Sequence, residues 1–552
     1  MRKNLICLVS VLCMLLGMPA HASDPGYSRV DGFVEVAPGV HLEASVYSPT
    51  AATPSAGWPL IVRQHGGGSN KDSAYDVNYA LEYIPRGFAV LMYSVRGHGG
   101  SEGTFDWFGP ETIADFSKML DWVGATFPTI DVNRTGTSGY SQGGGTSLLP
   151  AEFDARVKVV AAGNTFSSLN EALNPNGCFK LAFATAIFAA AYKVSASRTD
   201  DATALRWGAT LYTDTEGIDP GAPPWVLPFP PPALPRPPYV PLSTSQELAG
   251  RSPITYMSSL VSRRVPVFWS NSWEDQLFPG DHPARILEPL EAAGIPTHYW
   301  FASGGHAAGA NDQADEIGKE AAMLDWFDQY LRGVDHGFAS RPKVDFAQRV
   351  PGTATWAHKT SASWPPASAP LTLHPTNGGS LSSSSDPTWS STIVNDLANA
   401  NIANDSVTSN EIAGRVGATG IVKSVPDSGT PVDTQTFIGP ALPSALESTG
   451  SPMLHLSATS TAKKVTQIDA KVWDISPNGS SEIVNRGCWS GDPQRLSSLS
   501  LALWPNSHVW AAGHHIALSI GTVDFPVFEA DKEPAAVTLT SPTNIEVPVT
   551  SG

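Results

Sequence analysis

Short apolar runs alternate with segments of helical periodicity along the first 340 residues. The apolar and polar positions from Val30 to Ser48 alternate, which predicts a pair of strands. Five nearly continuous apolar runs each predict a buried strand: Pro59–Gln64, Phe88–Ser94, Val157–Ala162, Pro266–Ser270 and His298–Phe301. Helical spacing recurs between and after them, over Pro110–Gly124, Gln142–Ala151 and Asp312–Arg332. This alternation predicts an α/β core, in which helices cover both faces of a parallel sheet.

Residues 165–251 interrupt the alternation. An Ala/Phe-rich helix is predicted over Leu181–Tyr192, and a proline-dense stretch follows from Pro220 to Pro241, with 11 prolines in 22 residues. Such a density of proline excludes the interior of a helix or a sheet. We interpret the segment as a surface loop over the core. Alternatively, it belongs to a lid over a pocket, and its apolar helix lines the acyl side.

After about residue 340 the helical patterns stop. Turns rich in Ser, Thr, Gly and Pro separate short alternating runs: Met453–Ala458, Gln467–Ile475, Val509–Ile520 and Ala536–Leu539. This pattern predicts an antiparallel sandwich. The expected division is a signal peptide at 1–22, a core at 23–164 and 252–339, a cap insertion at 165–251 and an all-β domain at 340–552.

Composition and charge narrow the function classes. Hydrophobic residues make up 41% of the 552 residues and charged residues only 15%, with 49 glycines and 47 prolines, which is typical of a folded, turn-rich protein. The formal net charge is −17, and basic clusters are absent. An acidic surface repels phosphate backbones and anionic lipids, so nucleic acid and membrane partners are disfavoured.

The N-terminus has the features of a secretory signal. Arg2 and Lys3 precede an apolar run that is too short to span a bilayer, and Ala20-His21-Ala22 forms a small-x-small cleavage site. We expect cleavage after Ala22, secretion to the periplasm or the medium, and no membrane anchor.

The mature chain then keeps two cysteines, Cys178 and Cys488. They could form one disulfide in an oxidising compartment or remain two buried thiols, and we favour the thiols. Their spacing does not indicate a metal site.

The strongest chemical signal is Gly139-Tyr140-Ser141-Gln142-Gly143, which follows a short strand and precedes a helix. Glycines two residues on either side of a serine allow a sharp strand-to-helix turn that exposes the hydroxyl. Ser141 is therefore the predicted nucleophile, and the alternative is a glycine-rich structural turn.

A serine nucleophile needs a base and an acid. In a fold with this strand–turn–helix arrangement, the three residues are expected along the chain in the order serine, acid, histidine. Asp275 lies just beyond the strand Pro266–Ser270, and His306 lies beyond the next strand. Both therefore belong to the edge of the sheet where the carboxyl ends of parallel strands meet. Glu274 also qualifies by position but is expected to face solvent or substrate. Three further residues fit these roles less well: Asp281, His282 and His298.

An oxyanion hole needs two donors directed at the developing negative charge. One predicted donor is the backbone N–H of Gln142. The other comes from the loop His65-Gly66-Gly67-Gly68, in which Gly66 and Gly67 allow backbone N–H groups to approach the substrate, as in HGGG-type esterases. The alternative is an ordinary glycine-rich turn.

Several motifs together resemble those of the peptidase S15 family, which includes Xaa-Pro dipeptidyl-peptidases, cocaine esterase and other CocE/NonD-type hydrolases, acylases and α-amino-acid ester hydrolases. The matching segments are RGHGGSEG (Arg96–Gly103), GYSQGG, RSPITY (Arg251–Tyr256), the WED and GGH turns, ATWAHKTSASWPP (Ala354–Pro366), TFIGP (Thr436–Pro440), KVWDISPNG (Lys471–Gly479) and AAGHHIALSI with DFP (Ala511–Pro526). The resemblance implies an α/β-hydrolase core with an inserted helical cap, followed by an all-β jelly-roll domain. It also implies a triad of Ser141, Asp275 and His306.

The chain differs from this family at three points. The family often supplies a tyrosine hydroxyl to the oxyanion hole just after the strand that precedes the glycine loop, where this chain reads Gln64-His65-Gly66-Gly67. Backbone donors are expected to replace it. The elbow lacks the acidic residue typical of amino-acid ester hydrolases, and the chain enters its first strand soon after the signal, without the N-terminal helical domain of the dipeptidyl-peptidases.

These features predict a secreted serine hydrolase that cleaves carboxylic esters, with amides as a second class of bond, through an acyl-enzyme. The expected partner is a small-molecule or peptide-like acyl substrate, and no metal or organic cofactor is implied. One alternative is a dipeptidyl-peptidase or acylase, in which a cap carboxylate such as Glu216 or Glu247 holds the substrate amine. An alternative of another class is a non-catalytic glycan-binding protein.

Other polar and aromatic residues have structural interpretations. Arg96 and His98 are expected to fix a loop beside the site, and His514 and His515 cannot both face one side of a strand. Four tryptophans could line an acyl pocket, although packing is the default: Trp107, Trp207, Trp225 and Trp273.

Overall fold

The structure is a computed structural model of the chain. It describes residues 26–180, 184, 192, 195–213, 243–306, 312–351, 353, 355–395, 434–524, 527–528 and 533–550. The predicted signal peptide, most of the predicted helix Leu181–Tyr192 and the proline-dense stretch lie outside these residues. Glu216 and Trp225 also lie outside them.

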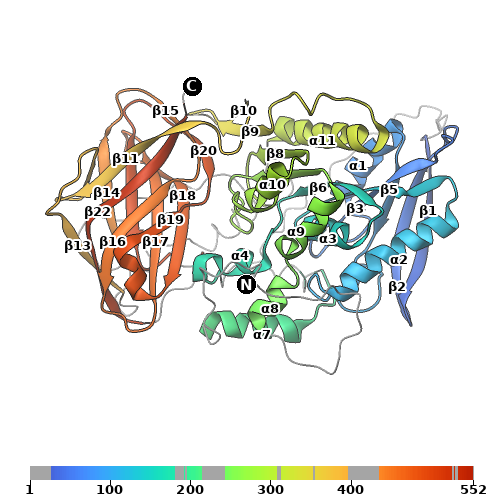
Figure 1. The fold of residues 1–552 in the computed structure, drawn as a ribbon, viewed down its shortest axis with the longest axis horizontal. Coiled ribbons are helices and arrows are strands. Elements are labelled where there is room, and N and C mark those ends of the chain that lie inside the picture. Colours follow the sequence, from blue (N-terminus) through green and yellow to red (C-terminus); the bar gives the residue numbers. More distant parts are fainter. Residues whose placement is uncertain are drawn as a thin grey trace, which may run out of the picture.

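A ten-stranded sheet forms the first half of the molecule (Figure 1). Its spatial order is β1-β2-β4-β3-β5-β6-β7-β8-β9-β10, and all neighbouring pairs from β4 to β9 are parallel. The strands are β1 (Tyr27–Ala37), β2 (Val40–Pro49), β3 (Trp58–Gln64), β4 (Ala89–Tyr93), β5 (Ile130–Tyr140), β6 (Val157–Gly163), β7 (Val267–Ser272), β8 (Thr297–Ala302), β9 (Val344–Arg349) and β10 (Trp356–Ser361). The predicted parallel sheet and the predicted strand pair at its start are both present.

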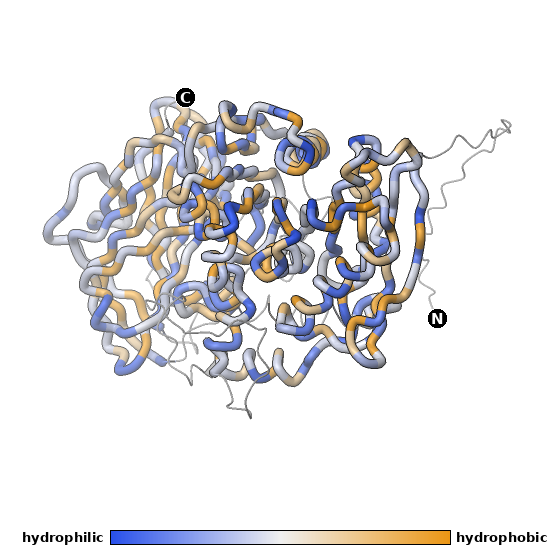
Figure 2. Tube along the Cα trace, turned by 45° about the vertical axis from the view of Figure 1, so that its right-hand side comes forward, coloured by the Kyte–Doolittle hydropathy of each residue, from blue (hydrophilic) through white to orange (hydrophobic). Residues whose placement is uncertain are grey.

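Helices cover the two faces of this sheet (Figure 1). On one face lie α2 (Pro110–Thr126), α3 (Gln142–Phe153), α9 (Pro253–Arg263) and α10 (His282–Ala292). On the other lie α1 (Ala74–Tyr83), which continues into a 3₁₀ turn at Ile84–Arg86, and α11 (Gln313–Phe327), which continues into a π turn at Asp328–Arg332. Their buried apolar positions pack on the strands, and hydrophobic residues alternate with polar ones along the chain (Figure 2).

Helix α2 shows how the sequence determines such an element. Pro110 stands at its first position, where the missing N–H costs no hydrogen bond. Ile113, Phe116, Leu120 and Val123 follow at spacings of three and four and are buried. The helix therefore packs one apolar stripe on the sheet.

The segment between β6 and α9 contributes short helices beside the carboxyl edge of the sheet. They are α4 (Leu169–Leu173), a 3₁₀ turn at Pro175–Gly177, α7 (Asp201–Thr213) and α8 (Thr244–Ala249). Ser243 and Gln246 form a reciprocal capping box at the start of α8. We refer to the described part of this predicted insertion as the cap.

Twelve further strands form the C-terminal all-β domain (Figure 1). Its main path is β18-β17-β21-β14-β12-β11-β22-β15-β20, and β13, β16 and β19 join through β22 and β16. The strands are β11 (Ser368–Thr376), β12 (Ser380–Ser382), β13 (Ser390–Asn395), β14 (Thr434–Ala441), β15 (Leu446–Gly450), β16 (Met453–Ser460), β17 (Thr466–Ile475), β18 (Ser481–Gly491), β19 (Leu499–Ala502), β20 (Asn506–Trp510), β21 (His515–Gly521) and β22 (Ala535–Thr550); a 3₁₀ turn at Pro493–Ser498 precedes β19. Residues from both ends of the path share one hydrophobic core.

Two details differ from the sequence pattern. The strands β9 and β10 pair with the first sheet, although they follow residue 340. The run Val509–Ile520 is two strands rather than one, because residues 511–514 form a turn between β20 and β21. His514 consequently lies in the turn and pairs with Asp474, while His515 begins β21 and contacts the Gly439 carbonyl.

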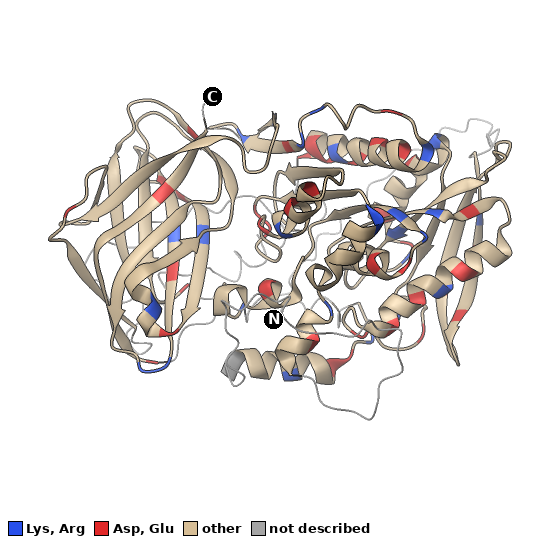
Figure 3. Ribbon diagram, viewed as in Figure 1, with Lys and Arg blue, Asp and Glu red and all other residues tan. Residues whose placement is uncertain are grey.

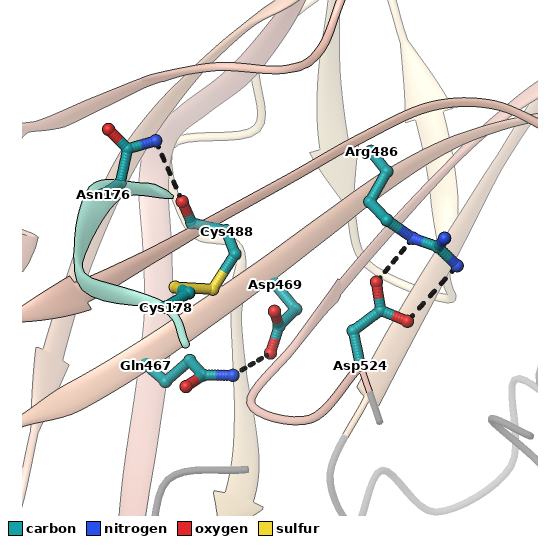
Figure 4. The surroundings of a disulfide bond; sticks show 7 residues. All are labelled: Asn176, Cys178, Gln467, Asp469, Arg486, Cys488 and Asp524. Carbon is teal, nitrogen blue, oxygen red and sulfur yellow. Dashed lines mark hydrogen bonds and ion pairs between the residues drawn. A yellow bond between two sulfur atoms is a disulfide. The ribbon is translucent and has the colours of Figure 1, made fainter. Parts of the chain in front are cut away.

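The expectation of two free thiols is wrong, because Cys178 and Cys488 form a disulfide (Figure 4). Their Cα atoms are 6.2 Å apart across a sequence separation of 310 residues. The fold brings the 3₁₀ turn before Cys178 against β18, and the Asn176 side chain also donates to the Cys488 carbonyl at 3.1 Å. Because 310 residues separate the two cysteines, the sequence pattern could not predict that they lie close together in space.

Charged residues are more frequent on the helices of the first half, α11 among them, than on the strands of the all-β domain (Figure 3). Within the described residues, no helix combines the length and apolar character that a membrane crossing requires. The same residues hold no group of three or more His, Cys, Asp or Glu side chains arranged to bind a metal ion.

Candidate active site

Ser141 stands at the sharp turn between β5 and α3. Its φ of 58° and ψ of −124° are strained for a residue with a side chain. A Cβ atom on Gly139 would lie 2.6 Å from the Gly143 backbone, and one on Gly143 would collide with the Gln64 carbonyl. Both glycines are therefore required for strand and helix to meet, as the pattern predicted.

Tyr140, the residue before the nucleophile, is held by a buried network of side chains. The Tyr140 hydroxyl donates to Glu320 of α11 at 2.7 Å. Arg63 of β3 is fully buried and contacts both Glu320 and Asp76. This buried network supports the end of β5, where the strained turn begins.

His306 contacts both predicted partners. Its Nε2 lies 2.9 Å from Ser141 Oγ, and its Nδ1 lies 2.8 Å from Asp275 Oδ2. The carboxylate accepts a hydrogen bond from the Nδ1–H group. Nε2 of the neutral imidazole is then unprotonated and can accept the serine proton. Asp275 is 1% exposed, and its Oδ1 accepts the backbone N–H groups of Leu277 and Phe278, each at 2.9 Å. These two hydrogen bonds hold the Asp275 carboxylate in position independently of its contact with His306.

The residues considered as alternatives have other contacts. Asp281 pairs with Arg285 in α10. His282 accepts from Ser167, with Nδ1 2.9 Å from its Oγ, and His298 pairs with Asp345 at 2.8 Å.

Glu274 makes contacts outside the proposed triad. It donates its backbone N–H to Gly304, and it lines a crevice against β18 together with Glu482 and Arg486. The structure thus brings Asp275, and not Glu274, to the histidine.

The glycine loop lies against the elbow. A Cβ on Gly66 would lie 3.8 Å from the Tyr140 carbonyl, and one on Gly67 would lie 3.5 Å from Gln142 Oε1. His65 donates through Nδ1 to the Gly66 carbonyl at 2.8 Å and accepts the Val95 N–H at 2.9 Å. Burial lowers the pKa of His65 to about 4, so the ring stays neutral and keeps its acceptor. Gln142, Gly66 and Gly67 are therefore neighbours beside Ser141.

Tyr192 was not predicted to belong to this site. Its buried hydroxyl donates to Gln142 Oε1 at 2.8 Å, and it lies where a Cβ on Gly67 would come within 2.7 Å. Its ring packs among Phe105, Trp107 and His98. The loop after β3 lacks the tyrosine that is often found there in this family. That absence was the one feature of the sequence that could have suggested a tyrosine hydroxyl from another part of the chain.

The loop Arg96–Gly103 is fixed as expected. Arg96 donates twice to Asp115, at 2.9 and 2.7 Å. His98 contacts the Arg96 carbonyl through Nδ1 at 3.1 Å, and burial together with the nearby His65 lowers its pKa to about 3. Both residues therefore hold the loop beside the site.

Aromatic rings border the triad on the cap side. Phe278 meets the His306 ring edge-on at 5.3 Å, and Phe166 and then Phe108 continue the row at 5.8 and 4.8 Å. This apolar border shields the imidazole from water. Trp273 stacks on Phe301 at 4.4 Å, and it also lines the crevice that Glu274 borders.

Glu247, one of the two carboxylates considered for amine binding, is already engaged. Its Oε2 accepts from the Trp207 indole at 2.7 Å and from Arg206 at 2.8 Å. The negative charge is therefore balanced within the cap.

Comparisons with known proteins identify the family of the chain. The model of the X-Pro dipeptidyl-peptidase (S15 family) matches residues 38–308, and that of the X-Pro dipeptidyl-peptidase C-terminal non-catalytic domain matches residues 336–546. The comparison with curated proteins finds no match.

Solved structures match over almost the whole chain. An aminopeptidase from a marine sediment Thaumarchaeota archaeon is 16% identical, with 98% of this chain and 99% of that chain covered and a TM-score of 0.68. An α-amino acid ester hydrolase is 16% identical (97% and 99% covered, TM-score 0.66), and a CocE/NonD family hydrolase from Staphylococcus aureus is 12% identical (97% and 99%, TM-score 0.62). These matches show an α/β-hydrolase fold with a C-terminal all-β domain.

Proposed function

Because the chain belongs to the X-Pro dipeptidyl-peptidase (S15) family of ester and amide hydrolases, we propose that it is a serine hydrolase of carboxylic esters. In this proposal Ser141 is the nucleophile, His306 the general base and Asp275 the acid that orients it. The observation that carries it is the pair of contacts of His306, at 2.9 Å to the serine and 2.8 Å to the carboxylate. That geometry suits proton removal from the serine as it attacks.

The reaction follows in two halves. Ser141 Oγ attacks the ester carbonyl carbon as its proton passes to Nε2 of His306, and the carbonyl oxygen becomes an oxyanion facing the N–H groups of Gln142 and of Gly66 or Gly67. The intermediate collapses, the leaving alkoxide takes the proton, and an acyl-enzyme remains. Water then attacks the acyl carbon while giving a proton to His306. This second intermediate collapses as the bond to Ser141 Oγ breaks, His306 returns the proton to Oγ, and the carboxylic acid is released.

The peptidase alternative remains the second candidate, since the family model carries that name. It requires a carboxylate that binds a free substrate amine. The engagement of Glu247 by Trp207 and Arg206 favours the ester hydrolase instead. Equal cleavage of N-acetylated and free-amine substrates would contradict the dipeptidyl-peptidase alternative, whereas rejection of the N-acetylated form would support it.

The non-catalytic glycan-binding protein is disfavoured by the same two histidine contacts, because an inert core has no need of an aligned base. Failure of a fluorophosphonate probe to label Ser141 would revive it.

Secretion is also proposed. The disulfide between Cys178 and Cys488 suits an oxidising compartment, which agrees with the predicted signal at residues 1–22. Expression of the full chain in a secreting host, followed by N-terminal sequencing, should give a mature chain that begins at Ser23. Retention of Met1 in exported, active protein would contradict it.

The activity test compares the mature protein with Ser141→Ala on a series of p-nitrophenyl esters and a free-amine Xaa-Pro anilide. Ser262→Ala, an exposed serine of α9, is the matched control. Ester hydrolysis that is lost only in Ser141→Ala, with the anilide untouched, is expected. Rapid anilide cleavage would move the protein to the dipeptidyl-peptidases.

A further inference from the structure

A lysine of the cap lies against the turn that carries the proposed catalytic acid. Lys180 is fully buried, and its ammonium donates to the carbonyl oxygens of Gln276 at 2.9 Å and Leu277 at 2.7 Å. The same turn uses the N–H groups of Leu277 and Phe278 to hold Asp275. The carbonyl side of the turn therefore binds the lysine, and its N–H side binds the acid.

The all-β domain holds this lysine from the opposite side. The Trp504 ring lies 5.4 Å from the ammonium, within cation–π distance. Two residues earlier in the chain, Cys178 is bonded to Cys488 of β18 (Figure 4). Arg486, also on β18, donates to Gln276 Oε1 at 3.0 Å. The acid turn is thus enclosed between the cap and the C-terminal domain.

The charges around the ammonium come from several elements. They are Asp275 of the acid turn, Asp281, His282 and Arg285 around the start of α10, Glu171 of α4 and Arg486 of β18. Burial is the largest influence and lowers the pKa of Lys180 to about 7, while the nearby carboxylates oppose it. Lys180 therefore carries its positive charge below neutral pH.

We propose that Lys180 is a positioning residue for the triad. It fixes the turn that presents Asp275 and keeps a positive charge beside the Asp275–His306 pair, and the disulfide and Trp504 of the all-β domain hold it in place. The C-terminal domain thereby influences hydrolysis through the turn that carries the acid. This inference rests on the proposed triad.

The first test measures the pH profile of kcat/KM for ester hydrolysis in Lys180→Met and Lys180→Gln. Loss of a positive charge makes protonation of His306 easier, so both variants should move the acidic limb upward by about half a pH unit or more. Lys180→Met should also lose kcat about fivefold, because both hydrogen bonds to the turn are gone. Lys180→Gln, which keeps a donor, should lose less.

Lys71→Met is the matched control. Lys71 is also buried, but its ammonium pairs with Asp72 at 2.7 Å and with Asp31 of β1 at 3.8 Å, and β1 lies at the opposite end of the sheet from β8, which precedes His306. This variant should leave the acidic limb in place. An unmoved limb in folded Lys180 variants, or an equal shift in Lys71→Met, would overturn the proposal.

A second measurement needs no substitution. The disulfide of the unmodified protein is reduced, the two thiols are counted by mass, and retention of the fold is checked by circular dichroism. We expect kcat to fall about threefold or more, with KM changed less than twofold, because the turn is loosened and the substrate pocket is not. An unchanged kcat in the folded, reduced protein would overturn the proposal even where the lysine variants fail to fold.

Failure of the proposed function itself gives a different result. In that case Ser141→Ala retains the ester hydrolysis of the parent protein. If Ser141→Ala is inactive while the Lys180 variants and the reduced protein match the parent, only this inference fails.

Discussion

The hydroxyl of Tyr192 in the cap donates a hydrogen bond of 2.8 Å to the side chain of Gln142, the residue after the proposed nucleophile. The same hydroxyl lies over Gly67 of the glycine loop. The cap, the elbow and the loop after β3 therefore meet at one point, which is where an oxyanion would be bound. The tyrosine stabilises the position of a backbone donor from outside the core sheet.

Tyr192→Phe is expected to lower kcat about threefold to tenfold, because one hydrogen bond that positions Gln142 is removed, with a free energy of about 0.5–1.5 kcal/mol. Steady-state kinetics on a p-nitrophenyl ester measure this change. The melting temperature should change little, since the ring remains packed. An unchanged kcat would show that the hydroxyl does not support the oxyanion site.

Gly67→Ala is expected to lower kcat at least tenfold. Its Cβ would lie 2.7 Å from the Tyr192 hydroxyl oxygen and 3.0 Å from the ring carbon that bears it, so the glycine loop or the cap must move. The double variant with Tyr192→Phe should recover part of the loss, because the closest atom is gone. A purely additive double variant would contradict this steric account.

Acid should destabilise the protein through its buried histidines. Burial lowers the pKa of His282 to about 3, below that of an unfolded histidine, so the unfolded chain takes up the proton first. This contribution to stability is complete above about pH 6.5 and is lost as the pH falls towards 3.

His282→Gln should therefore flatten the decline in the free energy of unfolding by about 1.4 kcal/mol per pH unit between pH 6 and 4. Urea unfolding at several pH values provides the comparison. Other groups, such as Glu171, whose pKa is raised by burial, contribute equally to both proteins, so their effect cancels in the comparison. Parallel pH curves for the two proteins would contradict the assignment.

Removal of the disulfide should cost about 2–5 kcal/mol of unfolding free energy. The double variant Cys178→Ser/Cys488→Ser leaves the long connection between the two halves open in the unfolded chain. Guanidinium unfolding of the parent with and without reductant should give the same difference. If reductant left the parent unchanged, the two cysteines would not be bonded in solution.

The sequence predicted most of the core because buried parallel strands are nearly continuous apolar runs, and β3, β6, β7 and β8 appear at the expected positions. The proposed triad could be predicted for a related reason: its nucleophile, acid and base follow the strands β5, β7 and β8, whose carboxyl ends meet at one edge of the sheet. The sequence already favoured Asp275 over Glu274, and the structure adds a physical reason, because two N–H groups of the following turn bind the Asp275 carboxylate.

Two of the missed features depend on contacts distant in sequence. Tyr192 reaches Gln142 only after the cap folds back on the elbow, and the partner of Cys178 lies in another domain. Neither contact leaves a periodic pattern. The split between β20 and β21 was missed because a short turn interrupts an otherwise alternating run.

The most direct test of the central claim is the site at which a fluorophosphonate attaches. The mature protein is incubated with the probe, digested, and analysed by mass spectrometry, beside Ser141→Ala and His306→Ala. We predict a single adduct on Ser141, absent from the serine variant and formed far more slowly without the imidazole 2.9 Å from the hydroxyl. An adduct on another residue, or equal labelling without His306, would contradict the account.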